Sequence, residues 1–295
     1  MWNCCHYLYF EFLAGRSLDL LEERCQHYIP FMKELQRNEA AMVSAPLWRL
    51  VLDLIQSPEA AHLSAATRLE RHGTVDAVMA SITQTSPVAP DFARVTESML
   101  MAYRREYVAG AERSIERGNS FLGNFPFQPI GMWDWFLRGV CLYAAAKSRP
   151  KRRRRYRSHG KKVLAILEKF VCQGDINVRH HAALLAAEDL TLQRKFREAR
   201  QSYESAIVGA SRGGFIHDAA MANERYALCL LHELKDTESA RFHFGEADRL
   251  YREWGAHVIA NGLHEVRASL PKKEPAANKE SPGGLLVPTR FVEEP

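Results

Sequence analysis

Apolar residues recur at intervals of three and four along the chain, whereas the strict alternation typical of strands is nearly absent. Such spacing places apolar side chains on one face of an α-helix. The pattern therefore predicts an all-α protein. The expected helices cover 18–35, a segment that begins at Ser44 ahead of Pro46, 58–71, 74–84, 91–117 and 131–147, with a Gly- and Pro-rich loop over 118–131.

Two stretches in the C-terminal half share a pattern of alanines and aromatic residues at an offset of 41 residues. A small residue lets two helices approach closely, and an aromatic residue one turn later fills the space between hairpins. We expect burial at these equivalent positions, in a stack of helical hairpins; two unrelated amphipathic helices that share alanines are the alternative. The corresponding pairs are Ala199 and Ala240, Tyr203 and Phe244, and Ala206 and Ala247.

The positive charge of the chain is concentrated in one segment. The net charge is +5, but residues 151–162 hold eight basic residues and no acidic one. Because positive charge opposes the positive end of a helix, the run is expected to form an exposed loop, with the next helix starting near Ser158. The candidate partner-binding patch comprises Lys151, Arg152, Arg153, Arg154, Arg155 and Arg157.

Several roles remain open for this basic run. A solvated loop between helices is one, and a nuclear-localisation or nucleic-acid patch is another. An acidic protein or a lipid headgroup is a third class of partner. Tyr156 is the one aromatic residue in the run that could stack on a base, which disfavours RNA.

The chemistry-bearing residues form no known catalytic or metal-binding motif. No P-loop, kinase catalytic motif or G-x-G-x-x-G occurs, and His180 and His181 are adjacent without a metal-ligand spacing, so packing or surface roles are expected for the histidines. Four cysteines are expected on apolar helix faces: Cys25, Cys141, Cys172 and Cys229. No C-x-x-C pair is present, and no apolar run approaches 20 residues, so we predict a cytoplasmic protein without a membrane segment. Since the catalytic motifs are also missing, we expect a non-enzymatic protein without a cofactor.

The spacing of alanines around Tyr203 and Phe244 resembles that in the second helix of a tetratricopeptide repeat. Over about 165–271 the chain also resembles the helical-repeat segment of large multidomain signalling kinases, which combine a protein-kinase-like and ATPase part with a sensor histidine kinase; the likeness is weaker over 10–150. The residues that carry it are Ala187-Glu188, Tyr203-x2-Ala206-Ile207, Gly214-Phe215, Ala220-x-Ala222-Asn223-Glu224, Tyr251-x2-Trp254-Gly255-Ala256, Leu263 and Pro271.

The resemblance implies a tetratricopeptide-like helical hairpin array, an α-solenoid with regulatory or scaffolding work. Its partners would be a protein or peptide, with kinase or ATPase domains among the candidates, and the chain would be a stand-alone descendant or a piece of a longer protein. A nuclear or nucleic-acid-associated adaptor is the alternative. The expected organisation is a helical array over 1–150, a basic loop over 151–160, repeats over 161–270 and a disordered tail over 271–295.

Overall fold

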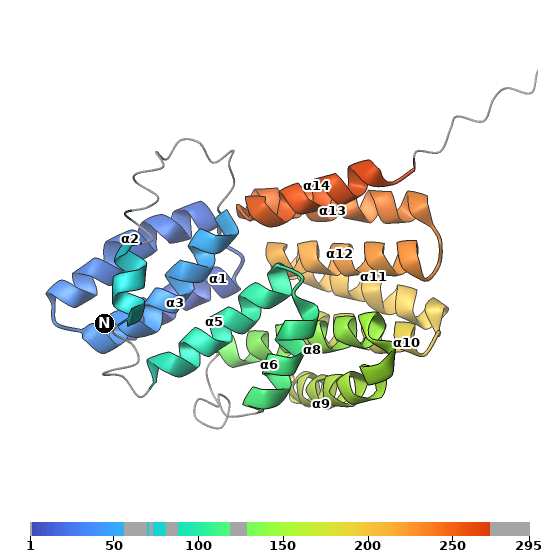
Figure 1. Ribbon diagram of the computed structural model, residues 1–295, viewed down its shortest axis with the longest axis horizontal. Coiled ribbons are helices and arrows are strands. Elements are labelled where there is room, and N and C mark those ends of the chain that lie inside the picture. Colours follow the sequence, from blue (N-terminus) through green and yellow to red (C-terminus); the bar gives the residue numbers. More distant parts are fainter. Residues whose placement is uncertain (1, 56–69, 71–72, 81–87, 119–128, 272–295) are drawn as a thin grey trace, which may run out of the picture.

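Every regular element in the described part of the chain is a helix (Figure 1). The computed structural model describes residues 2–55, 70, 73–80, 88–118 and 129–271. The predicted all-α class is therefore confirmed. The helix expected over 58–71 lies almost entirely outside the described residues, as does the tail expected to be disordered over 271–295.

The C-terminal half is a row of helices that pack against one another in chain order. Figure 1 shows this row from α9 to α14. Each of three helix pairs is joined by a short connection, and a final helix packs on the last pair. The elements are α8 (Pro129–Ser148), the 3₁₀ helix η1 (Pro150–Arg152), α9 (Arg153–Cys172), α10 (Arg179–Leu192), α11 (Phe196–Gly213), α12 (Ile216–His232), α13 (Thr237–Trp254) and α14 (His257–Ser269).

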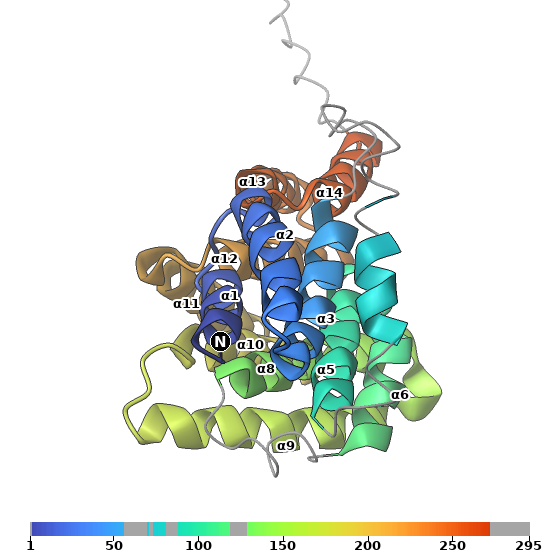
Figure 2. The ribbon, with the colours of Figure 1, turned by 90° about the vertical axis from the view of Figure 1, so that its left-hand side faces the viewer.

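The N-terminal helices lie along one side of this row, contact both α8 and α14, and share its core (Figures 1 and 2). The Phe12 ring lies 5.5 Å from the Trp254 ring, and the Tyr103 ring lies at the same distance from Trp254 on another side. One hydrophobic cluster thus spans both parts of the chain. The N-terminal elements are α1 (Trp2–Leu13), α2 (Leu18–Glu34), α3 (Asn38–Ile55), α5 (Ala89–Tyr103) and α6 (Tyr107–Arg117), and residues 73–80 are also helical.

The expected burial of the repeated aromatic residues is confirmed. Tyr203 on α11 is 0% exposed and Phe244 on α13 is 1% exposed. Tyr203 lies between neighbouring helices, because its hydroxyl donates to Glu188 of α10 and its ring stacks on Tyr226 of α12. The repeated alanines are buried as well, namely Ala199, Ala206, Ala240 and Ala247.

Two predicted helix boundaries are wrong. The third helix begins at Asn38 and continues through Pro46, although an interior proline removes a hydrogen bond and costs about 3 kcal/mol. Burial of apolar residues on both sides of Pro46, from Ala40 to Trp48, outweighs that cost. The single helix expected over 91–117 is two helices, since Arg105 adopts a left-handed conformation with φ of 61° and ends α5.

Cysteine burial also differs from expectation at one position. Cys25, Cys141 and Cys229 are buried on apolar faces as predicted, but Cys172 is exposed. It is the last residue of α9, directly after the partly buried Phe170 and Val171. Among the described residues, no helix combines the length and apolar character needed to cross a bilayer.

Candidate functional site

The basic run is helical, so the loop predicted over 151–160 is wrong. Pro150–Arg152 form η1 and α9 begins at Arg153, with no acidic residue in its first turn. Each exposed positive side chain near the positive end of a helix costs only about 0.3–1 kcal/mol in electrostatic repulsion. Burying Tyr156, Val163 and Leu167 on the inner face of α9 yields more than that, which explains why the helix starts early.

Of the six basic residues predicted to form an exposed patch, five are exposed and Arg157 is not. Residues 151–155 are exposed, whereas Arg157 is half-buried and forms a bidentate ion pair with Asp189, with N–O distances of 2.7 and 3.0 Å. Arg157 therefore fastens α9 to α10 and does not face solvent with its neighbours.

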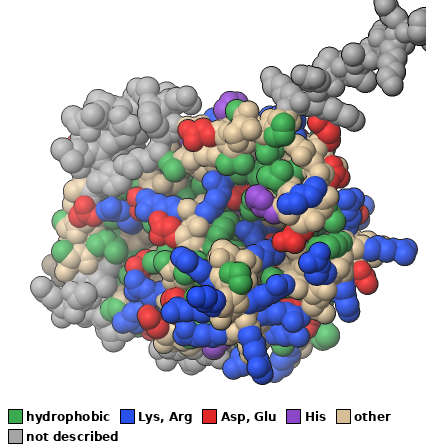
Figure 3. Space-filling view, turned by 45° about the vertical axis from the view of Figure 1, so that its right-hand side comes forward, with side chains coloured by type: hydrophobic (Ala, Val, Ile, Leu, Met, Phe, Trp, Pro, Cys, Tyr) green, Lys and Arg blue, Asp and Glu red, His purple; other side chains and the backbone are tan. Residues whose placement is uncertain are grey.

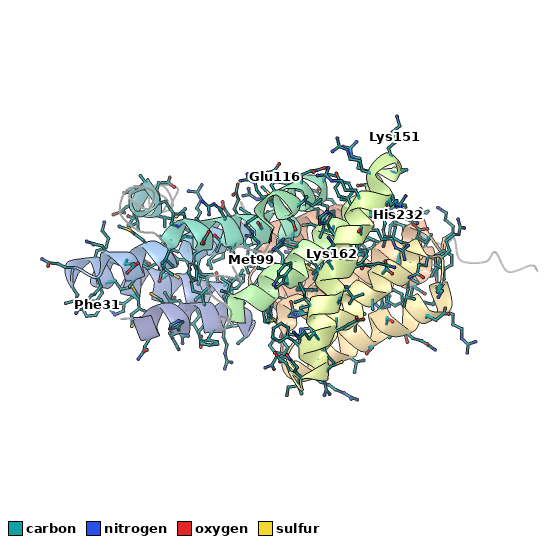
Figure 4. All side chains as sticks on the ribbon, turned by 90° about the horizontal axis from the view of Figure 1, so that it is seen from below. Phe31, Met99, Glu116, Lys151, Lys162 and His232 are labelled. Atoms are coloured by element: carbon teal, nitrogen blue, oxygen red, sulfur yellow. The ribbon has the colours of Figure 1, made fainter. Side chains whose placement is uncertain are left out.

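A neighbouring turn extends the positive surface. Arg153 donates through Nη2 to the carbonyl oxygen of Leu192 at 2.5 Å, which brings the start of α9 against the α10–α11 turn. That turn carries Arg194 and Lys195, both exposed. We call this surface the basic edge; it comprises Lys151, Arg152, Arg153, Arg154, Arg155, Arg194 and Lys195. Figure 3 shows Lys and Arg side chains gathered over the lower part of that face, and Figure 4 shows Lys151 at one end of α9 and Lys162 farther along it.

One carboxylate partly balances the start of α9. Glu112 of α6 contacts Arg152 at 2.7 Å and Arg155 at 3.2 Å, and it accepts a hydrogen bond from the Tyr156 hydroxyl at 2.5 Å. The hydrogen bond from Tyr156, helped by the two arginines, lowers the pKa of Glu112. Lys151 and Arg154 form no ion pair with any described residue, so the basic edge keeps a surplus of positive charge.

A second group of charges lies inside the row of helices. Glu188 of α10 is fully buried and pairs with Arg225 of α12 at 2.9 Å and with Lys147 of α8 at 2.8 Å. Burial alone would raise the pKa of Glu188, but these two cations outweigh it and lower the pKa to about 2. Glu224, next to Arg225, pairs with Arg105 at 2.6 Å. These charges are mutually satisfied and hold α8, α10 and α12 to the α5–α6 turn.

The adjacent histidines lie in a third place. His180 and His181, in the first turn of α10, are buried, and both Nε2 atoms lie within 2.9 Å of one carboxylate oxygen of Asp218 on α12. In the part of the chain that the structure describes, these three side chains form the one group with the proximity of metal ligands. Asp218 is not recognisable as a partner of the histidines from the sequence, because its distance from them along the chain fits no metal motif.

Comparisons with known proteins identify no relative of this chain, so its function has to be inferred from the fold and from these sites. Neither a protein-family model, nor a curated protein, nor a solved structure matches the chain. The resemblance to the helical segment of signalling kinases therefore stays a prediction.

Proposed function

We propose that this protein is a non-catalytic, tetratricopeptide-like interaction module whose basic edge binds an acidic segment of a partner protein. Two features support the repeat assignment: α10 with α11 and α12 with α13 form successive hairpins, and the alanine–aromatic pattern is buried on the second helix of each. Modules of this kind bind partners through the surface that successive hairpins present together.

The observation that carries the proposal is the surplus of exposed cations at the start of α9. Five consecutive basic side chains lie at the positive end of that helix, with Glu112 as the carboxylate paired to them among the described residues. Mutual repulsion and the helix dipole both disfavour this arrangement in the free protein. A ligand rich in carboxylates relieves both effects and accepts charge-assisted hydrogen bonds from the guanidinium groups.

The aromatic content of the basic run favours an acidic protein over a single-stranded nucleic acid. Tyr156, the aromatic residue inside the basic run, is 0% exposed and hydrogen-bonded to Glu112, so it offers no face to a base. Stacking on aromatic side chains supplies much of the affinity of single-strand binding proteins. If the chain acts beside signalling enzymes, as its resemblance implies, an acidic surface of a kinase or ATPase domain is a partner of the proposed class.

Fluorescence anisotropy with a labelled glutamate-rich peptide tests this function. The variant Lys151→Glu/Arg154→Glu removes the two cations without an ion pair and leaves the contacts of Glu112 intact. The matched control Lys161→Glu/Lys162→Glu makes the same change of charge two turns farther along α9, on residues that are also exposed. We expect the first variant to weaken peptide binding about tenfold or more at low salt, and the control to change it less than about twofold.

Two results would contradict the proposal. Equal losses in both variants would mean that binding follows net charge and not the basic edge. A single-stranded DNA oligonucleotide that binds more tightly than the peptide, with a steep salt dependence, would favour the nucleic-acid alternative.

A further inference from the structure

The histidine–aspartate cluster is enclosed by the core. The side chains of His180, His181 and Asp218 are 4%, 0% and 2% exposed, and His217, the residue before Asp218, is 0% exposed. Nε2 of His180 lies 2.8 Å from Asp218 Oδ2, and Nε2 of His181 lies 2.9 Å from the same atom. The potential ligand atoms of these three residues all lie within 4.8 Å of one another.

Several polar atoms in the cluster have no hydrogen-bond partner among the residues that the structure describes. They are Asp218 Oδ1, His181 Nδ1 and both ring nitrogens of His217. An unpaired polar atom in the core costs about 1–3 kcal/mol, so native proteins rarely gather several in one place. Nε2 of His217 lies 3.7 Å from Asp218 Oδ1, which is too long for a hydrogen bond but short enough for both atoms to reach a common ion.

The charge of the cluster is also unbalanced. Among the described residues no Lys or Arg pairs with Asp218; its ionic neighbours are the three histidines. A buried carboxylate without a matching cation is strongly disfavoured.

We infer that His180, His181 and Asp218 bind a divalent transition-metal ion, and that a movement of His217 brings its Nε2 in as the fourth ligand. Imidazole nitrogens and a carboxylate oxygen suit Zn²⁺, whose bonds to these atoms are about 2.0–2.2 Å long in a tetrahedral site. Ligand atoms in such a site lie about 3.3 Å apart. The present distances from Asp218 Oδ2 to Nε2 of His180 and of His181, 2.8 and 2.9 Å, therefore need little change. The ion takes the place of the Nε2 hydrogens that now point to Asp218, and each imidazole stays neutral by carrying its hydrogen on Nδ1 instead.

The surroundings favour a structural site over a catalytic one. Aromatic rings cover the cluster: Phe136 stacks on His181 at 4.1 Å, Phe215 on His180 at 4.9 Å, and Trp254 on His217 at 5.0 Å. The α1–α2 turn closes the remaining side, because a Cβ on Gly15 would lie 2.9 Å from His217 Nδ1. Such a closed shell leaves no room for a substrate, so the ion would join α10 and α12 beneath the N-terminal helices.

Metal titration of the chelator-treated full-length protein tests the site. We expect one equivalent of Zn²⁺ to bind, and a hundredfold excess over Kd to raise the Tm by about 4 °C. Co²⁺ should bind at the same place and give the intense visible absorption of a tetrahedral site. Asp218→Asn preserves the size of the side chain but removes its charge, and should abolish both signals. His264→Gln, at a histidine 64% exposed on α14, is the control and should leave both unchanged.

The wild-type protein alone can refute the site, so the test does not depend on the folding of Asp218→Asn. Less than about 0.1 equivalent of bound Zn²⁺ and no change of Tm, with the helical circular dichroism intact, would show that the histidines only pack. One equivalent that disappears in His264→Gln but not in Asp218→Asn would place the ion on the surface.

Discussion

At the residue scale, the fold changes the ionisation of His181. Burial, together with the neighbouring His180, lowers its pKa from 6.5 to about 4, although Asp218 acts in the opposite direction. In the unfolded chain the ring keeps its ordinary pKa near 6.5. Between pH 6.5 and 4 the unfolded chain therefore binds a proton that the folded chain does not, and acid favours unfolding. His217, whose pKa burial also lowers, acts in the same direction.

Urea denaturation of the metal-free protein at a series of pH values should reveal this effect. We expect the free energy of unfolding to be highest above pH 6.5 and to fall by about 3 kcal/mol toward pH 4 through His181 alone. The carboxylate of Glu188, whose pKa falls from 4.5 to about 2 on folding, adds a further loss only below pH 4.5. His181→Gln should flatten the profile between pH 6.5 and 4.5. A variant profile parallel to that of the wild type would mean that His181 is protonated in the folded state.

At the scale of the elements, the contacts between successive hairpins depend on a few large side chains. Tyr203 is fully buried between α10 and α12; its hydroxyl donates to Glu188 at 3.0 Å, and its ring lies 5.0 Å from that of Tyr226. It combines apolar packing with a hydrogen bond to a buried carboxylate. Substitution can separate the two contributions.

Tyr203→Ala should lower the free energy of unfolding by about 3–5 kcal/mol, because it leaves a cavity in the core. Tyr203→Phe keeps the ring and loses one hydrogen bond, so its cost should be about 1–2 kcal/mol. Val208→Ala on the same helix, at a side chain 46% exposed, serves as the control and should cost less than about 0.5 kcal/mol. Chemical denaturation followed by circular dichroism measures all three. A Tyr203→Ala cost below 1 kcal/mol would contradict the packing role.

The elements also show how far sequence reasoning reaches. Helical periodicity and the alanine–aromatic offset predicted the fold class and the burial of Tyr203 and Phe244, because both depend on residues close together in the chain. The ends of the helices were harder to predict. Four inter-helix turns contain a residue in the left-handed conformation without the glycine that usually signals it, namely Gln36, Arg105, Arg194 and Lys235. Asp218 could not be connected to His180, since a carboxylate 38 residues away becomes a neighbour only when α12 packs beside α10.

At the scale of the whole molecule, the two parts of the chain depend on each other. Trp254, at the end of α13, is 0% exposed because Phe12 and Tyr103 of the N-terminal helices pack on it. Arg105 reaches from the α5–α6 turn to Glu224 of α12. The division near residue 150 that the basic run suggests is therefore crossed by core contacts and by an ion pair.

A fragment spanning residues 161–271 should fail to fold as a stable monomer. Without the N-terminal helices, Trp254 and His217 become exposed and Glu224 loses its partner Arg105, so we expect reduced helicity and association. The full-length chain should unfold in one cooperative transition. Circular dichroism and size-exclusion chromatography of both proteins measure the difference. A monomeric fragment with a sharp thermal transition would mean that the repeats form an independent domain.

The packing of Phe12 on Trp254 also affects the chain while it is being made. These residues are 242 positions apart, and at about 5–20 residues per second a ribosome needs roughly 10–50 s to pass from one to the other. During that time α1 can pack on α2 and α3, which follow it directly, but Phe12 on its apolar face still lacks its partner Trp254. The Phe12 side of α1 therefore stays uncovered until the end of α13 has been made, and it is an apolar surface that a chaperone would protect during synthesis.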